Sequence, residues 1–126
     1  MRTLTVFFLA GMLAGASPAP SPKPPQHCFS PQQFNGWRAA DTTTLYIRAD
    51  VNHFYRINLA HECSTLASPD AQLILGIHGG GLVCSATDIT LKASQPFTGS
   101  PEPCFVKDMT ELSAAEVAAI PRAQRP

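Results

Sequence analysis

Four cysteines that follow an export signal constrain this chain more than any other feature of its sequence. Arg2 supplies a positive charge, residues 4–13 form a short apolar run, and residues 14–16 are the small residues that a signal peptidase recognises. Export places the remaining chain in an oxidising compartment, where an even number of cysteines typically forms disulfides. The sequence therefore predicts a small domain held by two disulfides, formed from Cys28, Cys63, Cys84 and Cys104.

The export signal predicts a soluble periplasmic protein that is cleaved near Ala16. The apolar run is far shorter than the roughly 20 residues that cross a bilayer, so no transmembrane segment is expected. Residues 13–15 would suit a bacterial lipobox, but the next residue is Ala16 and not the cysteine that carries the lipid. The whole chain has nine basic and nine acidic residues, so its charge is balanced.

The mature chain is predicted to hold one folded domain between two irregular segments. Residues 17–27 contain five of the twelve prolines, which favours an extended linker that cannot bury a core. The domain is expected over residues 28–120, followed by a flexible tail at 121–126. A core of this size commonly needs covalent staples.

The pattern of the domain predicts short antiparallel strands. Residues 54–59 place Tyr55, Ile57 and Leu59 on one face, the period of a half-buried strand. The apolar run at 73–77 is expected to lie centrally in its sheet, and the glycines at 79–81 predict a hairpin that returns through 82–84. Other strands are expected at 44–48, 88–92 and 104–109, the last two separated by a loop that holds Pro96, Gly99, Pro101 and Pro103.

Two segments are predicted to be helical. A short turn or helix is expected between Cys63 and Asp70. Ser113 and Glu116 have the spacing of a capping box, which predicts a helix over 114–120. The fold class is therefore α+β, mainly antiparallel β: a small single domain of about five to seven short strands with a short C-terminal helix, stapled by two disulfides.

An ordered set of short motifs carries a resemblance to a known family. The motifs are Cys28-Phe29, Trp37, Cys63-x-x-Leu66, Cys84-Ser85-x-x-Asp88, Cys104-Phe105-Val106 and Leu112-Ser113-x-x-Glu116. In order and spacing the chain resembles a family of small exported bacterial proteins catalogued as a domain of unknown function, the one numbered six-four-nine-one. The resemblance implies a compact β-rich domain and no particular activity.

The pairing of the cysteines is open from the residues alone, since four cysteines allow three connectivities. A nested scheme, Cys28–Cys104 with Cys63–Cys84, would tie the ends of the domain together. The resemblance favours Cys63–Cys104 with Cys28–Cys84, because some relatives carry cysteines only at the equivalents of Cys63 and Cys104.

No metal ligand, cofactor or catalytic residue is predicted. The chain has no Cys-x-x-Cys, which argues against disulfide exchange. His27-Cys28 and His61-Glu62-Cys63 do not match the paired-ligand spacing of structural zinc sites, and oxidised cysteines cannot ligate.

The other candidates for catalysis have simpler structural interpretations. His78-Gly79-Gly80-Gly81 resembles an oxyanion-hole motif, but the nearest serine, Ser85, lacks the Gly-x-Ser-x-Gly elbow. His53 and His61 flank the strand at 54–59 with no nucleophile beside them. The acidic residues fall mostly at turns, where a carboxylate bonds its own backbone: Asp41, Asp50, Asp70 and Asp88.

The predicted surface does not identify a partner. Nucleic acid is disfavoured by the balanced charge and by basic residues spread along the chain, namely Arg38, Arg48, Arg56, Lys92 and Lys107. Four aromatic residues would form either a binding surface or, as favoured in a small β-domain, part of the core: Trp37, Tyr46, Phe54 and Tyr55.

The sequence thus predicts an exported, non-enzymatic binding or structural module whose partner is an unknown protein or small molecule of the cell envelope. The alternative is an inhibitor of an extracytoplasmic hydrolase. An inhibitor would need a protruding loop with a rigid polar or aromatic tip, and the segments 77–83 and 94–103 are its candidates.

Overall fold

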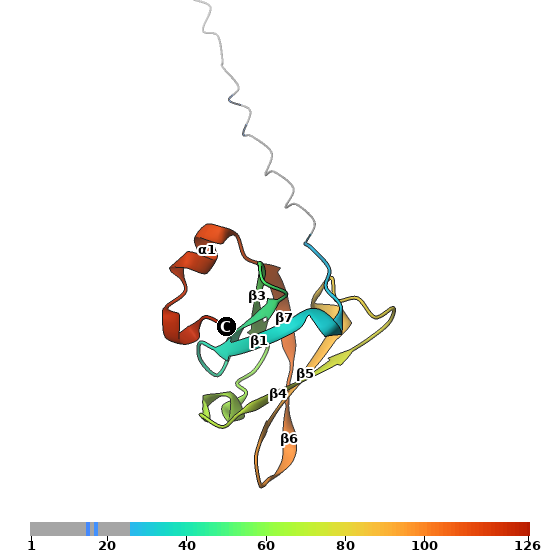
Figure 1. Cartoon of the computed structure of the whole chain (residues 1–126), viewed down its shortest axis with the longest axis vertical. Coiled ribbons are helices and arrows are strands. Elements are labelled where there is room, and N and C mark those ends of the chain that lie inside the picture. Colours follow the sequence, from blue (N-terminus) through green and yellow to red (C-terminus); the bar gives the residue numbers. More distant parts are fainter. Residues whose placement is uncertain (1–14, 16, 18–25) are drawn as a thin grey trace, which may run out of the picture.

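The computed structural model describes residues 15, 17 and 26–126. Seven antiparallel strands form two sheets, and a short α-helix follows them (Figure 1). The predicted α+β class with mainly antiparallel strands is therefore confirmed. The predicted export signal and most of the proline-rich linker lie outside the described residues. Among the residues that are described, no helix is long and apolar enough to cross a membrane.

The larger sheet has the strand order β1-β2-β3-β7. Its strands at β2, β3 and β7 confirm three of the predicted segments. β1 was not predicted, because Gly36 and a bulge between Phe34 and Gly36 interrupt the alternation of its side chains. The bounds of these strands are β1 (Phe34–Ala39), β2 (Thr44–Ala49), β3 (His53–Leu59) and β7 (Val106–Glu111).

The smaller sheet has the order β4-β5-β6, with β4 (Gln72–Ile77), β5 (Ile89–Gln95) and β6 (Thr98–Cys104). The expectation that the apolar run at 73–77 lies centrally is wrong, since β4 is an edge strand and Ile74 is 45% exposed. The central strand is β5, whose alternation of buried and exposed residues shows one covered face.

Two further expectations need correction. Residues 82–84 do not return as a hairpin strand, because the chain leaves β4 through a long connection in which Val83 forms only an isolated bridge with Phe29. Gly79 and Gly81 do adopt the left-handed backbone conformation that favours glycine. The expected loop at 96–103 is mostly strand β6, because an edge strand tolerates Pro101 and Pro103, whose missing N–H groups are not needed there.

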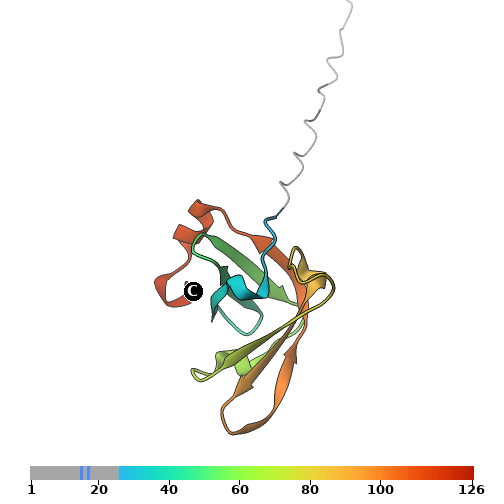
Figure 2. The same cartoon turned by 45° about the vertical axis from the view of Figure 1, so that its right-hand side comes forward.

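The core lies between the inner faces of the two sheets. In Figure 2 the two sheets are joined where β6 runs on into β7, and the chain passes from one sheet to the other through Phe105. The buried side chains include Phe29, Leu45, Ile47, Tyr55, Ile57, Val83 and Leu91. Burial of Tyr55, Ile57 and Leu59 confirms the face predicted for the strand at 54–59.

Two disulfides join segments that are distant in sequence. Cys63–Cys104 connects the end of β6 to the residue before the 3-10 helix η2 (Ser64–Ala67). Cys28–Cys84 attaches the N-terminal segment to the connection between β4 and β5. This is the crossed pairing that the family resemblance favours, not the nested one.

The predicted helical segments are present. η2 occupies the segment between Cys63 and Asp70, and α1 (Ala114–Ala119) begins with the expected capping box, in which Ser113 Oγ accepts a hydrogen bond of 3.2 Å from the Glu116 N–H. The tail contains the 3-10 helix η4 (Arg122–Gln124), and Arg125 donates to the Ile120 carbonyl at 2.7 Å. The remaining 3-10 helices are η1 (Pro31–Gln33) and η3 (Ala86–Asp88).

Candidate functional site

Two histidines and a glutamate from three distant segments converge at one end of the larger sheet. His53 begins β3, Glu111 ends β7, and His27 lies in the segment before Cys28. The Nδ1 atoms of His27 and His53 are 2.9 Å and 3.0 Å from the same oxygen, Oε1 of Glu111. Their candidate donor atoms all lie within 4.8 Å of one another. We call these three residues the His–Glu cluster.

The antiparallel register of β3 and β7 explains part of this convergence. Tyr55 pairs with Glu111, so the start of β3 and the end of β7 lie side by side. His53 lies two residues before Tyr55, on the same face of β3. The sheet thus positions His53 and Glu111 without any contribution from the N-terminal segment.

The N-terminal segment is held against the sheet by hydrogen bonds to the same residues. The His27 N–H donates to Glu111 Oε2 at 2.8 Å, and the Tyr55 hydroxyl donates to the His27 carbonyl at 2.6 Å. The Glu111 N–H donates to the side-chain oxygen of Gln26. Gln26 and His27, which the sequence places in the linker, are therefore bonded to the folded domain.

The electrostatics of the cluster follow from these contacts. Burial raises the pKa of Glu111, but hydrogen bonds from the His27 N–H and from both imidazoles outweigh it, so the pKa lies below its ordinary value. Burial, assisted by the negative charges of Glu111 and Asp50, raises the pKa of Tyr55 to about 12. Tyr55 is therefore a neutral hydrogen-bond donor at physiological pH.

A second carboxylate lies behind His53. Asp50 Oδ2 is 3.9 Å from Nε2 of His53, on the opposite side of the ring from Glu111. Asp50 Oδ1 accepts a hydrogen bond of 2.8 Å from the Asn52 N–H, as expected for an acidic residue at a turn. The hydrogen bond to the Asn52 N–H is also the main reason why the pKa of Asp50 is lowered.

Asp41 and Asp88, at two of the other predicted turns, bond the nearby backbone as expected. Asp41 Oδ1 accepts hydrogen bonds from Thr43 and Thr44, and the contacts with Thr43 contribute most to its lowered pKa. Asp88 accepts from the N–H groups of Cys84 and Ser85, both at 2.9 Å. These carboxylates organise loops.

Glu102 was not singled out from the sequence, although it has a clear structural role. Its carboxylate on β6 accepts hydrogen bonds from the N–H groups of Ser64 and Thr65, at the start of η2. These bonds lower its pKa, with the contacts to Thr65 contributing most. Glu102 lies 37 residues from Thr65 in the sequence, so this contact forms only in the folded chain.

The cysteines of the groups His27-Cys28 and His61-Glu62-Cys63 hold no free thiol. Cys28 and Cys63 are both in disulfides. His61 lies edge-on to the ring of Phe105, with 6.3 Å between the ring centroids. Of the histidines considered, His27 and His53 enter the His–Glu cluster. Sequence spacing could not identify this cluster, because Glu111 lies 84 and 58 residues from its partners.

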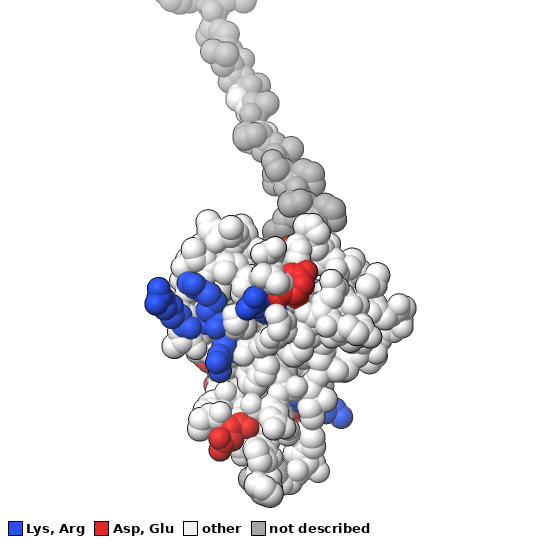
Figure 3. All heavy atoms as spheres, in the orientation of Figure 1, with Lys and Arg blue, Asp and Glu red and all other residues white. Residues whose placement is uncertain are grey.

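The aromatic residues are divided between the two faces of the larger sheet. Trp37 and Tyr55 face the core, where Tyr55 packs against Phe29 with 5.1 Å between the ring centroids. On the outer face Tyr46 lies between Arg38 and Arg56 in register. On the face that Figure 3 shows, most of the visible Lys and Arg side chains lie at the left, and another lies at the lower right. The four aromatic residues therefore do not make one surface.

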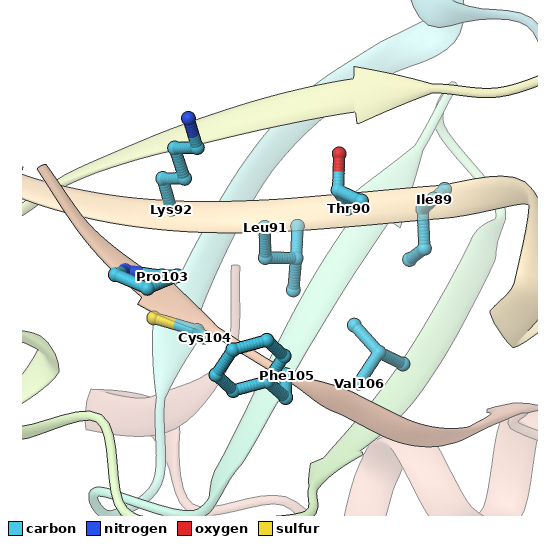
Figure 4. A pocket seen from close by; sticks show the side chains of 8 residues that line it. All are labelled: Ile89, Thr90, Leu91, Lys92, Pro103, Cys104, Phe105 and Val106. Atoms are coloured by element: carbon cyan, nitrogen blue, oxygen red, sulfur yellow. The ribbon is translucent and has the colours of Figure 1, made fainter.

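An apolar hollow of about 390 Å³ lies where the chain passes from β6 to β7. Figure 4 shows Leu91 and Ile89 from β5 facing Phe105 and Val106 across it. Phe105 is 61% exposed, so the hollow is an open surface feature.

The most exposed aromatic side chain lies at the turn between β5 and β6. Gln95 pairs with Thr98, which leaves Pro96 and Phe97 as the two residues of the turn. Phe97 is fully exposed and has a φ of 65°, a left-handed conformation that is uncommon for a bulky residue. The turn projects at the lower end of the domain in Figure 1 and Figure 2.

Comparison with known proteins identifies a family without an assigned activity. A model described as a family of unknown function (DUF6491) matches residues 1–126. No curated protein and no solved structure matches the chain.

Proposed function

This chain belongs to the family of unknown function DUF6491, and we propose that it is an exported domain that acts by binding a protein partner in the cell envelope. Binding, rather than catalysis, is proposed because all four cysteines are consumed in disulfides and the most prominent exposed group is an apolar anchor. The observation that carries the proposal is Phe97, fully exposed at the tip of the β5–β6 hairpin.

Export is supported by the disulfides together with the N-terminal pattern of residues 1–16. Disulfides of this kind persist in the periplasm and are rare in reducing compartments. Fractionation of cells that express the C-terminally tagged chain tests this part. We expect the protein in the periplasmic fraction, with a mature N-terminus near Ser17 and an intact mass four hydrogens below that of the reduced chain. A cytoplasmic protein with free thiols would contradict export.

Phe97 has the properties of a protein-binding anchor. Aromatic residues are enriched among the few side chains that dominate binding energy at interfaces. A fully exposed phenylalanine has no stabilising contact in the free domain, yet it is held at the end of a two-residue turn. Pro96 restricts the backbone immediately before it. The anchor is thus presented at low cost in conformational entropy.

The strand that carries the turn is suited to presenting it without self-association. Pro101 and Pro103 remove two backbone donors from the edge strand β6, which hinders the addition of another strand there. We therefore expect the partner to contact the tip of the hairpin rather than to extend its sheet.

Capture from a periplasmic extract tests this proposal. The mature domain serves as bait beside Phe97→Ala and a matched control, Val51→Ala, which removes another exposed apolar side chain at the β2–β3 turn. We expect a partner that is retained by the wild type and by the control and lost with Phe97→Ala. Capture that is equal for all three baits would contradict a role for the hairpin tip.

The second candidate, an inhibitor of an extracytoplasmic hydrolase, is favoured by the same hairpin. Residues 94–103 form the projecting element with an aromatic tip that an inhibitor needs. In the other candidate loop, 77–83, Leu82 is 53% exposed but lies beyond three glycines. Inhibition of periplasmic glycosidases, peptidases or amidases by the wild type but not by Phe97→Ala would select the inhibitor over a non-inhibitory binding module.

A further inference from the structure

We propose that His27, His53 and Glu111 bind one divalent transition-metal ion, with Zn²⁺ as the best match. This site is separate from the hairpin tip and does not depend on the protein partner proposed above. The argument rests on the donor atoms, on what orients them, and on the side of the cluster that is open to solvent.

The donor set and its spacing suit a transition metal. Zinc binds imidazole nitrogen and carboxylate oxygen at about 2.0–2.2 Å, so ligand atoms of one tetrahedral ion lie about 3.3 Å apart. In the cluster each Nδ1 already lies 2.9–3.0 Å from Glu111 Oε1. The candidate ligand atoms span up to 4.8 Å, so side-chain rotations are needed to bring all three to coordinating distance. The Nδ1 protons that bond Glu111 in the metal-free cluster leave for Nε2 or for solvent when the ion binds, so binding is expected to weaken at low pH. Two imidazoles favour zinc or copper over magnesium and calcium, which prefer oxygen ligands.

The carboxylate is oriented so that one oxygen remains for the ion. Oε2 of Glu111 accepts the 2.8 Å hydrogen bond from the His27 backbone N–H. Oε1 is the oxygen nearer to both imidazole rings, and Nδ1 of His27 also lies 3.1 Å from Oε2. A main-chain donor therefore fixes the carboxylate, and binding of an ion at Oε1 leaves that hydrogen bond intact.

An acidic side chain lies near the ring nitrogen of His53 that would face away from the ion. Nδ1 of His53 faces Glu111, and its Nε2 faces the Asp50 carboxylate at 3.9 Å. At this separation the Asp50 carboxylate does not accept a hydrogen bond from the ring, but its negative charge favours a proton on Nε2 and so leaves Nδ1 for the ion. Asp50 is itself held by the Asn52 N–H, so its position is defined by the β2–β3 turn.

The third ligand is held by the fold at two points. His27 is adjacent to Cys28, whose disulfide to Cys84 fixes the chain, and its carbonyl accepts the Tyr55 hydroxyl at 2.6 Å. The imidazole of His27 is 69% exposed, whereas Glu111 is only 19% exposed. One side of the ion would therefore face solvent, which leaves a fourth position for water, as in zinc sites with three protein ligands.

Titration of the metal-free protein with Zn²⁺ tests the proposal. Mature protein without a histidine tag, with both disulfides intact, is stripped with a chelator and titrated by calorimetry. We expect one ion per chain, and at least a ten-fold weaker affinity for His27→Ala, His53→Ala and Glu111→Gln. Asp50→Asn, which removes the negative charge near Nε2 of His53, is expected to weaken binding by less than any of the three ligand variants does.

His61→Ala is the matched control, because His61 is an exposed histidine outside the cluster. It should retain the wild-type affinity within two-fold. Far-UV circular dichroism and urea unfolding of each variant separate loss of ligand from loss of fold, and His53→Gln provides a variant of similar size. Equal affinity of the wild type and the His27→Ala/His53→Ala double variant would overturn the proposal and reduce the cluster to a hydrogen-bonded group.

Discussion

Replacing each disulfide by a pair of alanines separates the effect of loop length from the effect of burial. Cys28–Cys84 closes a sequence separation of 56 residues, and Cys63–Cys104 one of 41. In the chain-entropy model both closures contribute about 4 kcal/mol at 25 °C, the longer one slightly more. Loop length alone therefore predicts that loss of Cys28–Cys84 lowers the unfolding free energy at least as much as loss of Cys63–Cys104 does.

Burial reverses this order. Cys63 and Cys104 are 0% and 3% exposed, whereas Cys28 is exposed and Cys84 is half-buried. Deleting a buried heavy atom from a core costs about 1 kcal/mol, because the cavity is only partly filled by relaxation. We expect Cys63→Ala/Cys104→Ala to lose about 6 kcal/mol and Cys28→Ala/Cys84→Ala about 4 kcal/mol of unfolding free energy.

Urea unfolding under non-reducing conditions measures the difference. The fluorescence of Trp37, the one tryptophan of the chain, and far-UV circular dichroism report the transition. Since a domain of this size has a total stability of about 5–10 kcal/mol, the buried-pair variant is expected to show no cooperative transition or a much lower midpoint. If Cys28→Ala/Cys84→Ala lost as much unfolding free energy as Cys63→Ala/Cys104→Ala, or more, the role of burial would be refuted.

Three further predictions follow from single side chains. Tyr55→Phe removes the hydrogen bond to His27 and should cost about 1 kcal/mol of unfolding free energy. The pKa of Tyr55 is raised from 10.0 to about 12 by folding, so the stabilising contribution of its protonated hydroxyl is fully present below pH 10 and is lost as pH rises toward 12. Urea midpoints measured over this range should therefore fall less in the variant than in the wild type. Hydrogen bonds from Thr65 hold the pKa of Glu102 below its ordinary 4.5 in the folded protein, so the stability that the ionised carboxylate contributes is lost as pH falls below 4.5. In Glu102→Gln the urea midpoint should therefore decrease less on acidification than in the wild type. Phe97→Ala should leave the urea midpoint unchanged, since the side chain has no cover in the free domain, and a clear decrease would show that Phe97 is structural.

Local chemistry explains what could be predicted of the fold. The alternation at 54–59 identified β3 and its buried face, and the Ser113–Glu116 capping box identified the start of α1. β1 and β6 could not be predicted from the sequence, because glycine and proline usually interrupt strands and these strands contain Gly36, Pro101 and Pro103. Their tolerance depends on a bulge and on an edge position, and neither is visible before the strands are paired.

The candidate site could not be predicted for a different reason. His27, His53 and Glu111 have no common local motif, and one of them was placed in a linker. They meet only because β3 pairs with β7 and because a disulfide at Cys28 holds the N-terminal segment beside them. Metal-site motifs in a sequence are recognised from ligands a few residues apart, whereas Glu111 lies 84 residues from His27 and 58 residues from His53.

The most direct test of the proposed metal site is anomalous X-ray scattering at the zinc edge from crystals of the mature domain soaked in Zn²⁺. We predict one strong peak bonded to Nδ1 of His27, Nδ1 of His53 and the Glu111 carboxylate. Absence of a peak at these three residues in crystals whose other surface histidines bind zinc would contradict the account.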